Sequence, residues 1–261
     1  MAVNFRLAVA QAPAGLIGVS ARIDWLSNAL PEIVQQGADL LLLPELFACG
    51  YNIGDQIPDV AEPTDGPIFQ AVRDLAKRYK IAIHYGFAER DGDIFNTALC
   101  VGPDGNMLGK HRKLAIPPGF ERDCFTPGRG CEVLTYRGLR IATLICYDAE
   151  FAETARHVAA LGAELILVPT ALGADWGWVA GSMIPTRAYE NGVFLAYANS
   201  AGIENGMTYL GHSVIAAPDG VELARAGANP QILFADIDPD RVRKAQERLP
   251  YLSDRQSLKL T

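Results

Sequence analysis

Apolar and polar residues follow one another along this chain with two different periods. Short, nearly continuous apolar runs predict strands, and they occur at residues 5–10, 40–43, 81–86, 96–102, 108–114, 133–136, 139–146, 165–168, 193–199, 211–216, 223–226 and 232–236. Elsewhere apolar residues recur at the spacing of one helix face, which predicts helices at 23–36, 68–78, 151–161, 184–191 and 239–248. Turn residues at 103–105 and 137–138 predict two hairpins.

The order of these elements bears on the fold class. Strand–helix–strand and hairpin connections both occur, and strands without polar alternation are covered on their faces. The simplest architecture is therefore an α/β layered sandwich with mixed sheets. The 261 residues would suit between one and two domains of about 150 residues each. Because no Gly-, Ser- or Pro-rich linker interrupts the chain, we expect a single domain over residues 1–261.

Composition excludes several classes of protein. Apolar residues make up 49% and charged residues 20%, which is typical of a globular protein. The net charge of −7 offers no basic footprint for nucleic acid or an anionic membrane. We find neither a signal peptide nor an apolar run of about 18 residues, and we expect a cytoplasmic location.

The cysteines and histidines, which commonly bind metals, do not occur at the spacings of a metal site. The five cysteines form no CxxC pair, which favours reduced thiols over a disulfide framework. The four histidines lack metal spacing, and no P-loop, HExxH or GxGxxG motif occurs. We therefore expect neither a metal nor a cofactor.

Three reactive side chains each follow a predicted strand. Cys146 ends one apolar run just before a predicted helix, whose dipole would favour the thiolate. Lys113 ends another, and Glu45 follows four leucines, close to a sheet edge where open α/β sheets place their sites. Each also has a structural interpretation: a buried core cysteine, a solvated basic edge and an exposed loop acid. Glu121, in a loop soon after Lys113, is unremarkable alone.

Together these groups suit one reaction. Amide hydrolysis through a thiol needs a base that takes the thiol proton and later activates water. It also needs a cation or amide hydrogens around the developing oxyanion, and a proton for the leaving amine. A thiol, an ammonium and a carboxylate meet those demands without a histidine.

The segments around these residues resemble the three signatures of the nitrilase superfamily of carbon–nitrogen hydrolases. They are Leu43-Pro44-Glu45, residues 109–113 before Leu114, and residues 144–148, in the family's order and with similar separations. Further similar stretches flank them at 9–11, 125–128, 187–191, 211–213 and 218–220. The resemblance thus covers nearly the whole chain.

The resemblance implies a fold, an assembly and roles. The family fold is an α-β-β-α sandwich with two mixed sheets between helical layers, usually paired, so a homodimer or higher homo-oligomer is expected. Cys146 would be the nucleophile, Glu45 the general base and then acid, and Lys113 with the Tyr147 N–H would hold the oxyanion. Glu121 resembles the family's second glutamate, which orients the lysine or the substrate.

Within the superfamily, residues 50–54, 146–151 and 250–254 resemble 5-aminopentanamidase-type aliphatic amidases. Many members carry an arginine where Glu150 stands; an acid there could pair with a cationic substrate end or side chain, or act as a helix N-terminal acid. Tyr51 and Tyr147 lie in the matching segments and are candidate substrate contacts. Trp176 and Trp178 follow a predicted strand and either shape the pocket or pack on a surface.

The function that this resemblance implies is hydrolysis of a small linear amide, with a 5-aminopentanamide-like substrate favoured, through a cysteine thioester. The first alternative is an N-carbamoyl-amine hydrolase with the same site. A nitrilase is the next, although Tyr147-Asp148 differs from the tryptophan–glutamate pair frequent in that branch. Outside enzymes, the alternative is a catalytically silent scaffold.

Overall fold

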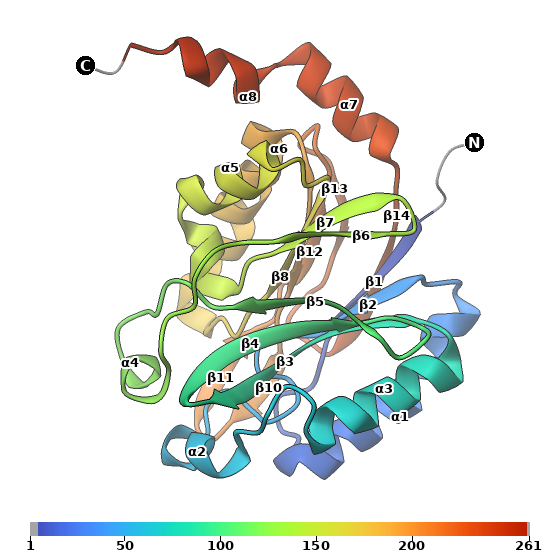
Figure 1. Ribbon diagram of the computed structural model, residues 1–261, viewed down its shortest axis with the longest axis vertical. Coiled ribbons are helices and arrows are strands. Elements are labelled where there is room, and N and C mark those ends of the chain that lie inside the picture. The colour runs from blue at the N-terminus through green and yellow to red at the C-terminus, as the bar shows by residue number, and fades with distance from the viewer. Residues whose placement is uncertain (1–4, 260–261) are drawn as a thin grey trace.

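The computed structural model describes residues 5–259 and contains two six-stranded mixed sheets (Figure 1). In the first sheet the strand order is β14-β1-β2-β3-β4-β5. Its strands are β1 (Phe5–Gln11), β2 (Leu40–Leu42), β3 (Ala82–Asp91), β4 (Asp93–Val101), β5 (Met107–Arg112) and β14 (Gln231–Ile237). β1, β2 and β3 run parallel, and β4 and β5 continue as antiparallel neighbours.

The second sheet has the order β13-β12-β9-β8-β7-β6, with β7, β8 and β9 parallel. Its strands are β6 (Val133–Tyr136), β7 (Leu139–Thr143), β8 (Leu165–Pro169), β9 (Phe194–Ala198), β12 (Val214–Ala216) and β13 (Glu222–Arg225). A separate hairpin joins β10 (Ala201–Glu204) to β11 (Met207–Leu210).

Helices lie around the two sheets (Figure 1). They are α1 (Gly18–Gln35), α2 (Ile57–Val60), α3 (Pro67–Tyr79), α4 (Phe120–Cys124), α5 (Ala152–Ala160), α6 (Ile184–Asn191), α7 (Pro239–Arg248) and α8 (Tyr251–Asp254). α1 and α3 lie against the first sheet, and α5 and α6 against the second. Within residues 5–259, no helix combines the length and the apolar character that crossing a membrane requires.

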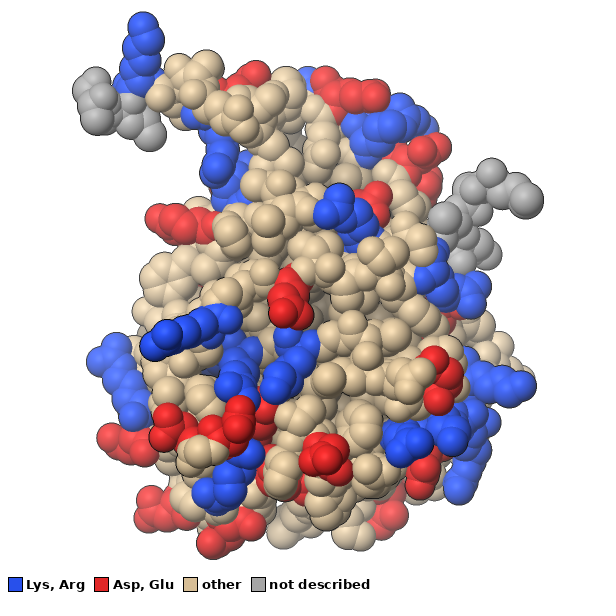
Figure 2. Space-filling model, in the orientation of Figure 1, with Lys and Arg blue, Asp and Glu red and all other residues tan. Residues whose placement is uncertain are grey.

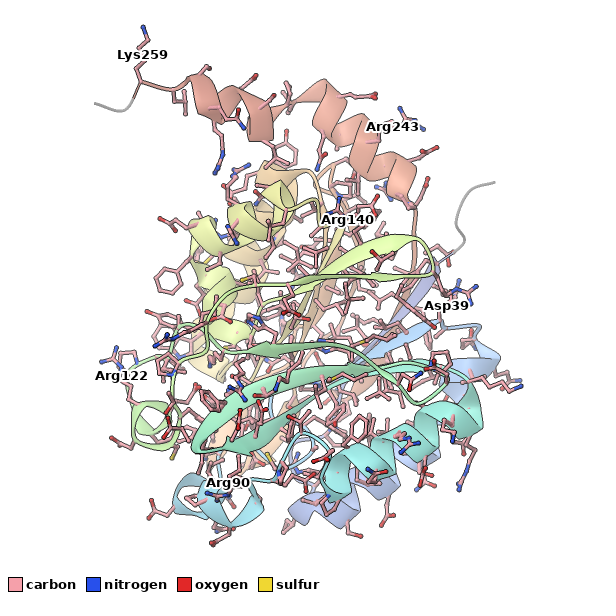
Figure 3. The ribbon with its side chains drawn as sticks, in the orientation of Figure 1. Asp39, Arg90, Arg122, Arg140, Arg243 and Lys259 are labelled. Atoms are coloured by element: carbon pink, nitrogen blue, oxygen red, sulfur yellow. The ribbon has the colours of Figure 1, made fainter. Side chains whose placement is uncertain are left out.

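The alternation of side chains along the strands explains these layers. On β1, Leu7 and Val9 pack into the core between the two sheets, whereas Ala8 and Ala10 face the helices. A strand sends successive side chains to opposite faces, so a continuous apolar run fills two cores at once. Figure 3 shows the interior between the sheets filled with side chains, while charged residues such as Arg122 lie at the periphery. The predicted α-β-β-α sandwich is confirmed.

Charged side chains of both signs are interspersed on the face shown in Figure 2. Each predicted strand and helix has an observed counterpart, but several bounds differ. α1 begins at Gly18 rather than at 23, β3 extends to Asp91 rather than to 86, and β7 ends at Thr143 rather than at 146. The hairpin 201–210 and the short helices α2, α4 and α8 were not predicted. Because β7 ends early, the segment that follows it is a turn rather than a strand.

Candidate active site

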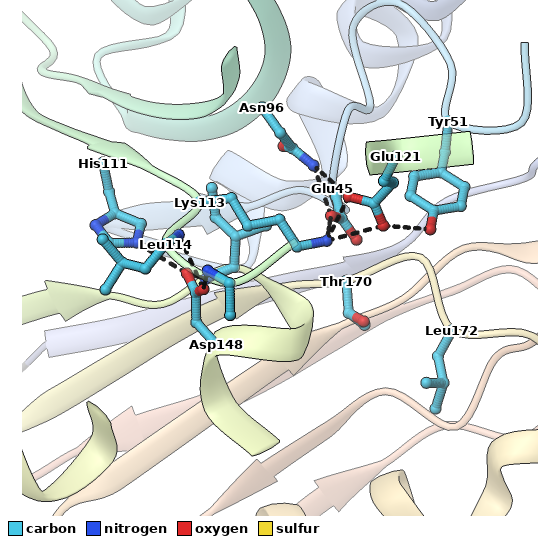
Figure 4. A network of polar contacts seen from close by, with 12 residues as sticks. Glu45, Tyr51, Asn96, His111, Lys113, Leu114, Glu121, Asp148, Thr170 and Leu172 are labelled. Atoms are coloured by element: carbon cyan, nitrogen blue, oxygen red, sulfur yellow. Dashed lines mark hydrogen bonds and ion pairs between the residues drawn. The ribbon is translucent and has the colours of Figure 1, made fainter. Parts of the chain in front are cut away.

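Lys113 follows β5 and is fully buried at one edge of the sandwich (Figure 4). Its Nζ lies 2.7 Å from Glu45 Oε1 and 2.7 and 3.0 Å from the two carboxylate oxygens of Glu121. Burial alone would lower the pKa of Lys113, but Glu45, Cys146 and Glu121 raise it above its ordinary value. The lysine is therefore a fixed cation and not the solvated basic edge that one interpretation of the sequence allowed.

Glu45 lies in the turn after β2 and is buried. Gly86 on β3 makes room for this turn, because a Cβ there would lie 2.4 Å from the Leu46 nitrogen. Glu45 Oε1 accepts hydrogen bonds from Lys113 Nζ and from Asn96 Nδ2, each at 2.7 Å. Oε2 is buried and has no partner among the described residues. Burial raises the pKa of Glu45 to about 7, against the opposing effect of Lys113.

Cys146 begins a 3₁₀ turn that spans Cys146–Glu150. Its φ is +48°, a left-handed conformation that is uncommon outside glycine and tends to occur at functional sites. The side chain packs beside Ala98 of β4 and is 8% exposed. Burial, followed by the negative charge of Glu45, raises the pKa of the thiol above its ordinary value.

The expectation that a helix dipole favours the Cys146 thiolate is therefore wrong. The helix that would supply the dipole, α5, begins only at Ala152, and two carboxylates act on the thiol. A neutral thiol at rest needs a base at the moment of attack. Of the two carboxylates that raise its pKa, Glu45 is the one with an oxygen, Oε2, that has no partner among the described residues.

Asp148 joins the cysteine turn to the lysine segment (Figure 4). Its Oδ1 accepts hydrogen bonds from the backbone N–H groups of Leu114 at 3.0 Å and Ala115 at 2.8 Å. Its Oδ2 accepts from the Ile145 N–H and lies 3.0 Å from His111 Nε2. Asp148 is fully buried, so these contacts fix Cys146 relative to the segment that follows Lys113.

Tyr51 contacts two carboxylates, Glu121 through its hydroxyl and Glu204 through its backbone N–H. Its hydroxyl donates to Glu121 Oε1 at 2.6 Å, which helps hold that carboxylate against Lys113. The loop that carries Tyr51 is fixed by Glu204, whose Oε2 accepts the backbone N–H groups of Tyr51 at 3.3 Å and Asn52 at 2.8 Å. The predicted residue Glu121 thus meets Lys113 and Tyr51 in one network.

A cavity of about 560 Å³ opens beside Cys146. The candidate contacts Tyr51, Tyr147, Glu150 and Trp176 all line it. The remaining lining residues are mostly apolar: Pro117, Pro118, Glu121, Ala171, Leu172, Gly173 and Met207. The volume suits a small molecule. Trp178 is 74% exposed and lies outside this lining, so of the two tryptophans only Trp176 shapes the pocket.

Glu150 ends the 3₁₀ turn and lines the same cavity. Its backbone carbonyl accepts a hydrogen bond from Arg187 Nη2 at 2.8 Å, and its carboxylate has no hydrogen-bond partner among residues 5–259. Burial raises its pKa, against the attraction of Lys113 and Arg187. The acid in the first turn of α5 is Glu153, so Glu150 is not a helix N-terminal acid.

Two residues of the network, Asn96 and Asp148, were not identified as candidates from the sequence. Asn96 lies inside β4, where an isolated polar residue gives no signal of its neighbours, and Asp148 was quoted only as part of a motif. Within the described part of the chain, no group of His, Cys, Asp and Glu has the arrangement of a metal site. The five cysteines are all free.

Comparisons with known proteins identify relatives of this chain. A family model described as carbon-nitrogen hydrolase matches residues 6–247. A protein described as hydrolase in pqqF 5′ region, from Pseudomonas protegens, is 38% identical over 97% of this chain and 89% of its own length. An (R)-stereoselective amidase of Pseudomonas sp. is 35% identical over 83% of this chain and 79% of its own length.

Among solved structures, an amidase from Nesterenkonia sp. has a TM-score of 0.81 and 32% identity, covering 97% of this chain and 96% of that one. A variant of that amidase with glutamate replaced by leucine carries the acetamide moiety of fluoroacetamide on its active-site cysteine. A variant with cysteine replaced by alanine binds butyramide.

Proposed function

Because the chain belongs to the carbon–nitrogen hydrolase family, the nitrilase superfamily, we propose that it hydrolyses a small linear amide to a carboxylate and ammonia, with Cys146 as the nucleophile. One observation carries the proposal. The Lys113 ammonium is held between two buried carboxylates near a buried thiol, and one oxygen of Glu45 has no partner among residues 5–259. That arrangement supplies a nucleophile, a base and an oxyanion partner in one place.

The first half of the reaction forms a thioester. Glu45 Oε2 takes the thiol proton as Cys146 Sγ bonds to the amide carbonyl carbon. Lys113 Nζ and the Tyr147 N–H stabilise the oxyanion of the tetrahedral intermediate. When the intermediate collapses, the carbon–nitrogen bond breaks, and protonated Glu45 gives its proton to the leaving nitrogen, which departs as ammonia.

The second half returns the enzyme to its starting state. The Glu45 carboxylate takes a proton from water, and the resulting hydroxide attacks the thioester carbon. The carbon–sulfur bond then breaks, the thiolate recovers the proton from Glu45, and the carboxylic acid product leaves and ionises. Glu121 holds Lys113 throughout by its two contacts, at 2.7 and 3.0 Å.

For the substrate, we favour a linear amide with an amine at the far end, such as 5-aminopentanamide. The support is Glu150, a carboxylate on the wall of the cavity that contains Cys146 and has no hydrogen-bond partner within the described chain. A cationic end near this carboxylate would be attracted, and an anionic end would be repelled. The small and mostly apolar cavity suits a short methylene chain between the two ends.

The test is release of ammonia from a panel of compounds. Pentanamide, 5-aminopentanamide and a linear amide with a terminal carboxylate carry a neutral, a cationic and an anionic far end, and an N-carbamoyl amine and an aliphatic nitrile represent the other branches. We expect the highest kcat/KM for 5-aminopentanamide, loss of that preference in Glu150→Gln, and no turnover in Cys146→Ala. Turnover of the nitrile or the carbamoyl compound alone would reject the amide assignment.

A further inference from the structure

Asn96 contacts each of the three charged residues of the site. Its Nδ2 donates to Glu45 Oε1 at 2.7 Å and lies 3.5 Å from Glu121 Oε2, and its backbone carbonyl accepts the Lys113 N–H at 2.8 Å. The side chain is 1% exposed and comes from β4, the strand beside the lysine strand (Figure 4). No other residue described in the network brings a neutral donor to the carboxylate of Glu45.

The two oxygens of Glu45 consequently have different environments. Oε1 takes two hydrogen bonds, one from the lysine and one from Asn96. Oε2 is equally buried and takes none from the described chain. A buried carboxylate oxygen without a donor is the more favourable place for a proton, because protonation there costs no existing hydrogen bond.

We propose that Asn96 is a positioning residue that keeps Glu45 ionised near neutral pH and leaves Oε2 as the oxygen that accepts the thiol proton. The inference rests on the proposed function, in which Glu45 is the base. An amide is suited to this task because its N–H stabilises the carboxylate without adding a charge. A second cation would hold the carboxylate ionised too strongly for it to accept a proton.

The proton affinity of Glu45 agrees with this role. Burial raises the pKa of Glu45 to about 7, and the hydrogen bonds from Lys113 and Asn96 act against that rise. Without the Asn96 donor the pKa would be higher, and a smaller fraction of the carboxylate would be ionised at neutral pH. The Asn96 side chain can be replaced without removing the backbone contact to Lys113, so the two effects can be separated.

The experiment measures the rate of Cys146 alkylation by iodoacetamide against pH, followed on the Cys146 peptide by mass spectrometry. This readout needs no knowledge of the substrate. In the wild type we expect the rate to fall below about pH 7 as Glu45 becomes protonated. In Asn96→Leu the midpoint should move up by about one to two pH units, the size expected for a lost hydrogen bond to a charged group.

Two further variants make the result decisive. Asn96→Asp keeps the shape and places a third acid beside Glu45 and Glu121, so it should also move the midpoint upward and serves if Asn96→Leu does not fold. Thr97→Val is the matched control, since Thr97 Oγ1 on the same strand donates to Glu89 Oε2 at 2.8 Å, away from the site. Its midpoint should equal that of the wild type.

The outcomes separate the two proposals. A midpoint that is present in the wild type, absent in Glu45→Gln and unmoved in both Asn96 variants would overturn the role of Asn96 and leave Glu45 as the base. A wild-type rate without this midpoint would overturn the base assignment and the present inference with it. An upward shift in both Asn96 variants, with Thr97→Val unchanged, supports the inference.

Discussion

Two buried carboxylates in the first half of this chain have pKa values that are shifted in opposite directions from the ordinary value of a glutamate. Burial raises the pKa of Glu45, in the turn after β2, to about 7. Burial also acts to raise the pKa of Glu89 on β3, but hydrogen bonds led by those from Arg112 outweigh it, and the pKa falls to about 2. Both side chains are almost fully shielded from solvent, at 0% and 1% exposure, although Glu45 lies deeper in the protein than Glu89.

The two carboxylates also differ in how many donors each one receives, and this difference acts on the pKa in the same direction as the difference in depth. Glu89 Oε1 accepts from Thr64, Lys110 and Arg112, and Oε2 accepts from Thr97 and again from Arg112. Both of its oxygens are satisfied by two cations and two hydroxyls. Glu45, by contrast, receives donors from the described residues on Oε1 alone and shares its lysine with a second carboxylate, Glu121.

Carboxylates that are shielded from solvent can therefore serve two purposes. A carboxylate with both oxygens occupied is an anchor, because protonating it would break several contacts. A carboxylate with one free oxygen and a pKa near neutrality can exchange a proton at low cost. The predictions below test this division into a reactive and a structural cluster.

The largest expected effect is on turnover in Cys146→Ala. Loss of the nucleophile should lower kcat by about 10⁴-fold or more, as expected when a covalent route is removed. The hydrogen bonds that join Lys113 to Glu45 and Glu121 do not involve the Cys146 thiol. The temperature of thermal unfolding should therefore stay close to that of the wild type. Cys131→Ala is the control. Ammonia release near the wild-type rate in Cys146→Ala would remove the nucleophile assignment.

Next in size is the effect of removing the buried ammonium. Lys113→Met should lower kcat by about 10²–10³-fold even at saturating substrate, because the lost interaction belongs to the transition state. Lys110→Met on β5, the strand that Lys113 follows, removes a cation from the Glu89 cluster and should leave kcat unchanged. A Lys113→Met variant changed only in KM, or a loss of kcat in Lys110→Met, would break the division between the two clusters.

The structural cluster should respond in stability instead. Glu89→Gln leaves Arg112 and Lys110 without their shared carboxylate and should lower the free energy of unfolding by about 1–3 kcal/mol, since both cations are partly exposed. Urea unfolding near pH 7 measures this change. The folded fraction should keep its wild-type kcat, and a variant of normal stability but low kcat would assign Glu89 to the reactive cluster.

The positions of the reactive groups were more predictable than their contacts. Apolar runs identify β2 and β7, and a residue that ends such a run lies at a sheet edge, which is how Glu45 and Cys146 could be found. Contacts between distant segments leave no such pattern. In the sequence, Arg22 is a charged residue that would be expected on the exposed face of α1. It is buried instead, because its guanidinium pairs at 2.5 Å with Glu204, far along the chain.

The last expected effect concerns the pH dependence of stability, to which the two carboxylates should contribute with opposite signs. The fold raises the pKa of Glu45 from 4.5 to about 7, so the folded state holds the proton more tightly than the unfolded state. Its contribution to stability is then complete below pH 4.5 and is lost as the pH rises through 7. The fold lowers the pKa of Glu89 from 4.5 to about 2, so its contribution is present above pH 4.5 and is lost as the pH falls towards 2.

Replacing each acid by glutamine should remove one of these slopes. Between pH 5 and 8, the free energy of unfolding of Glu45→Gln should rise relative to that of the wild type as the pH rises. This holds whatever the difference in stability between the two proteins at pH 5. Between pH 5 and 3, Glu89→Gln should lose less stability than the wild type, because it has no carboxylate to protonate. Urea unfolding across both ranges measures the slopes. Parallel curves for Glu45→Gln and the wild type between pH 5 and 8 would mean that Glu45 binds its proton equally in both states, and the contrast between a reactive and a structural carboxylate would then need another origin.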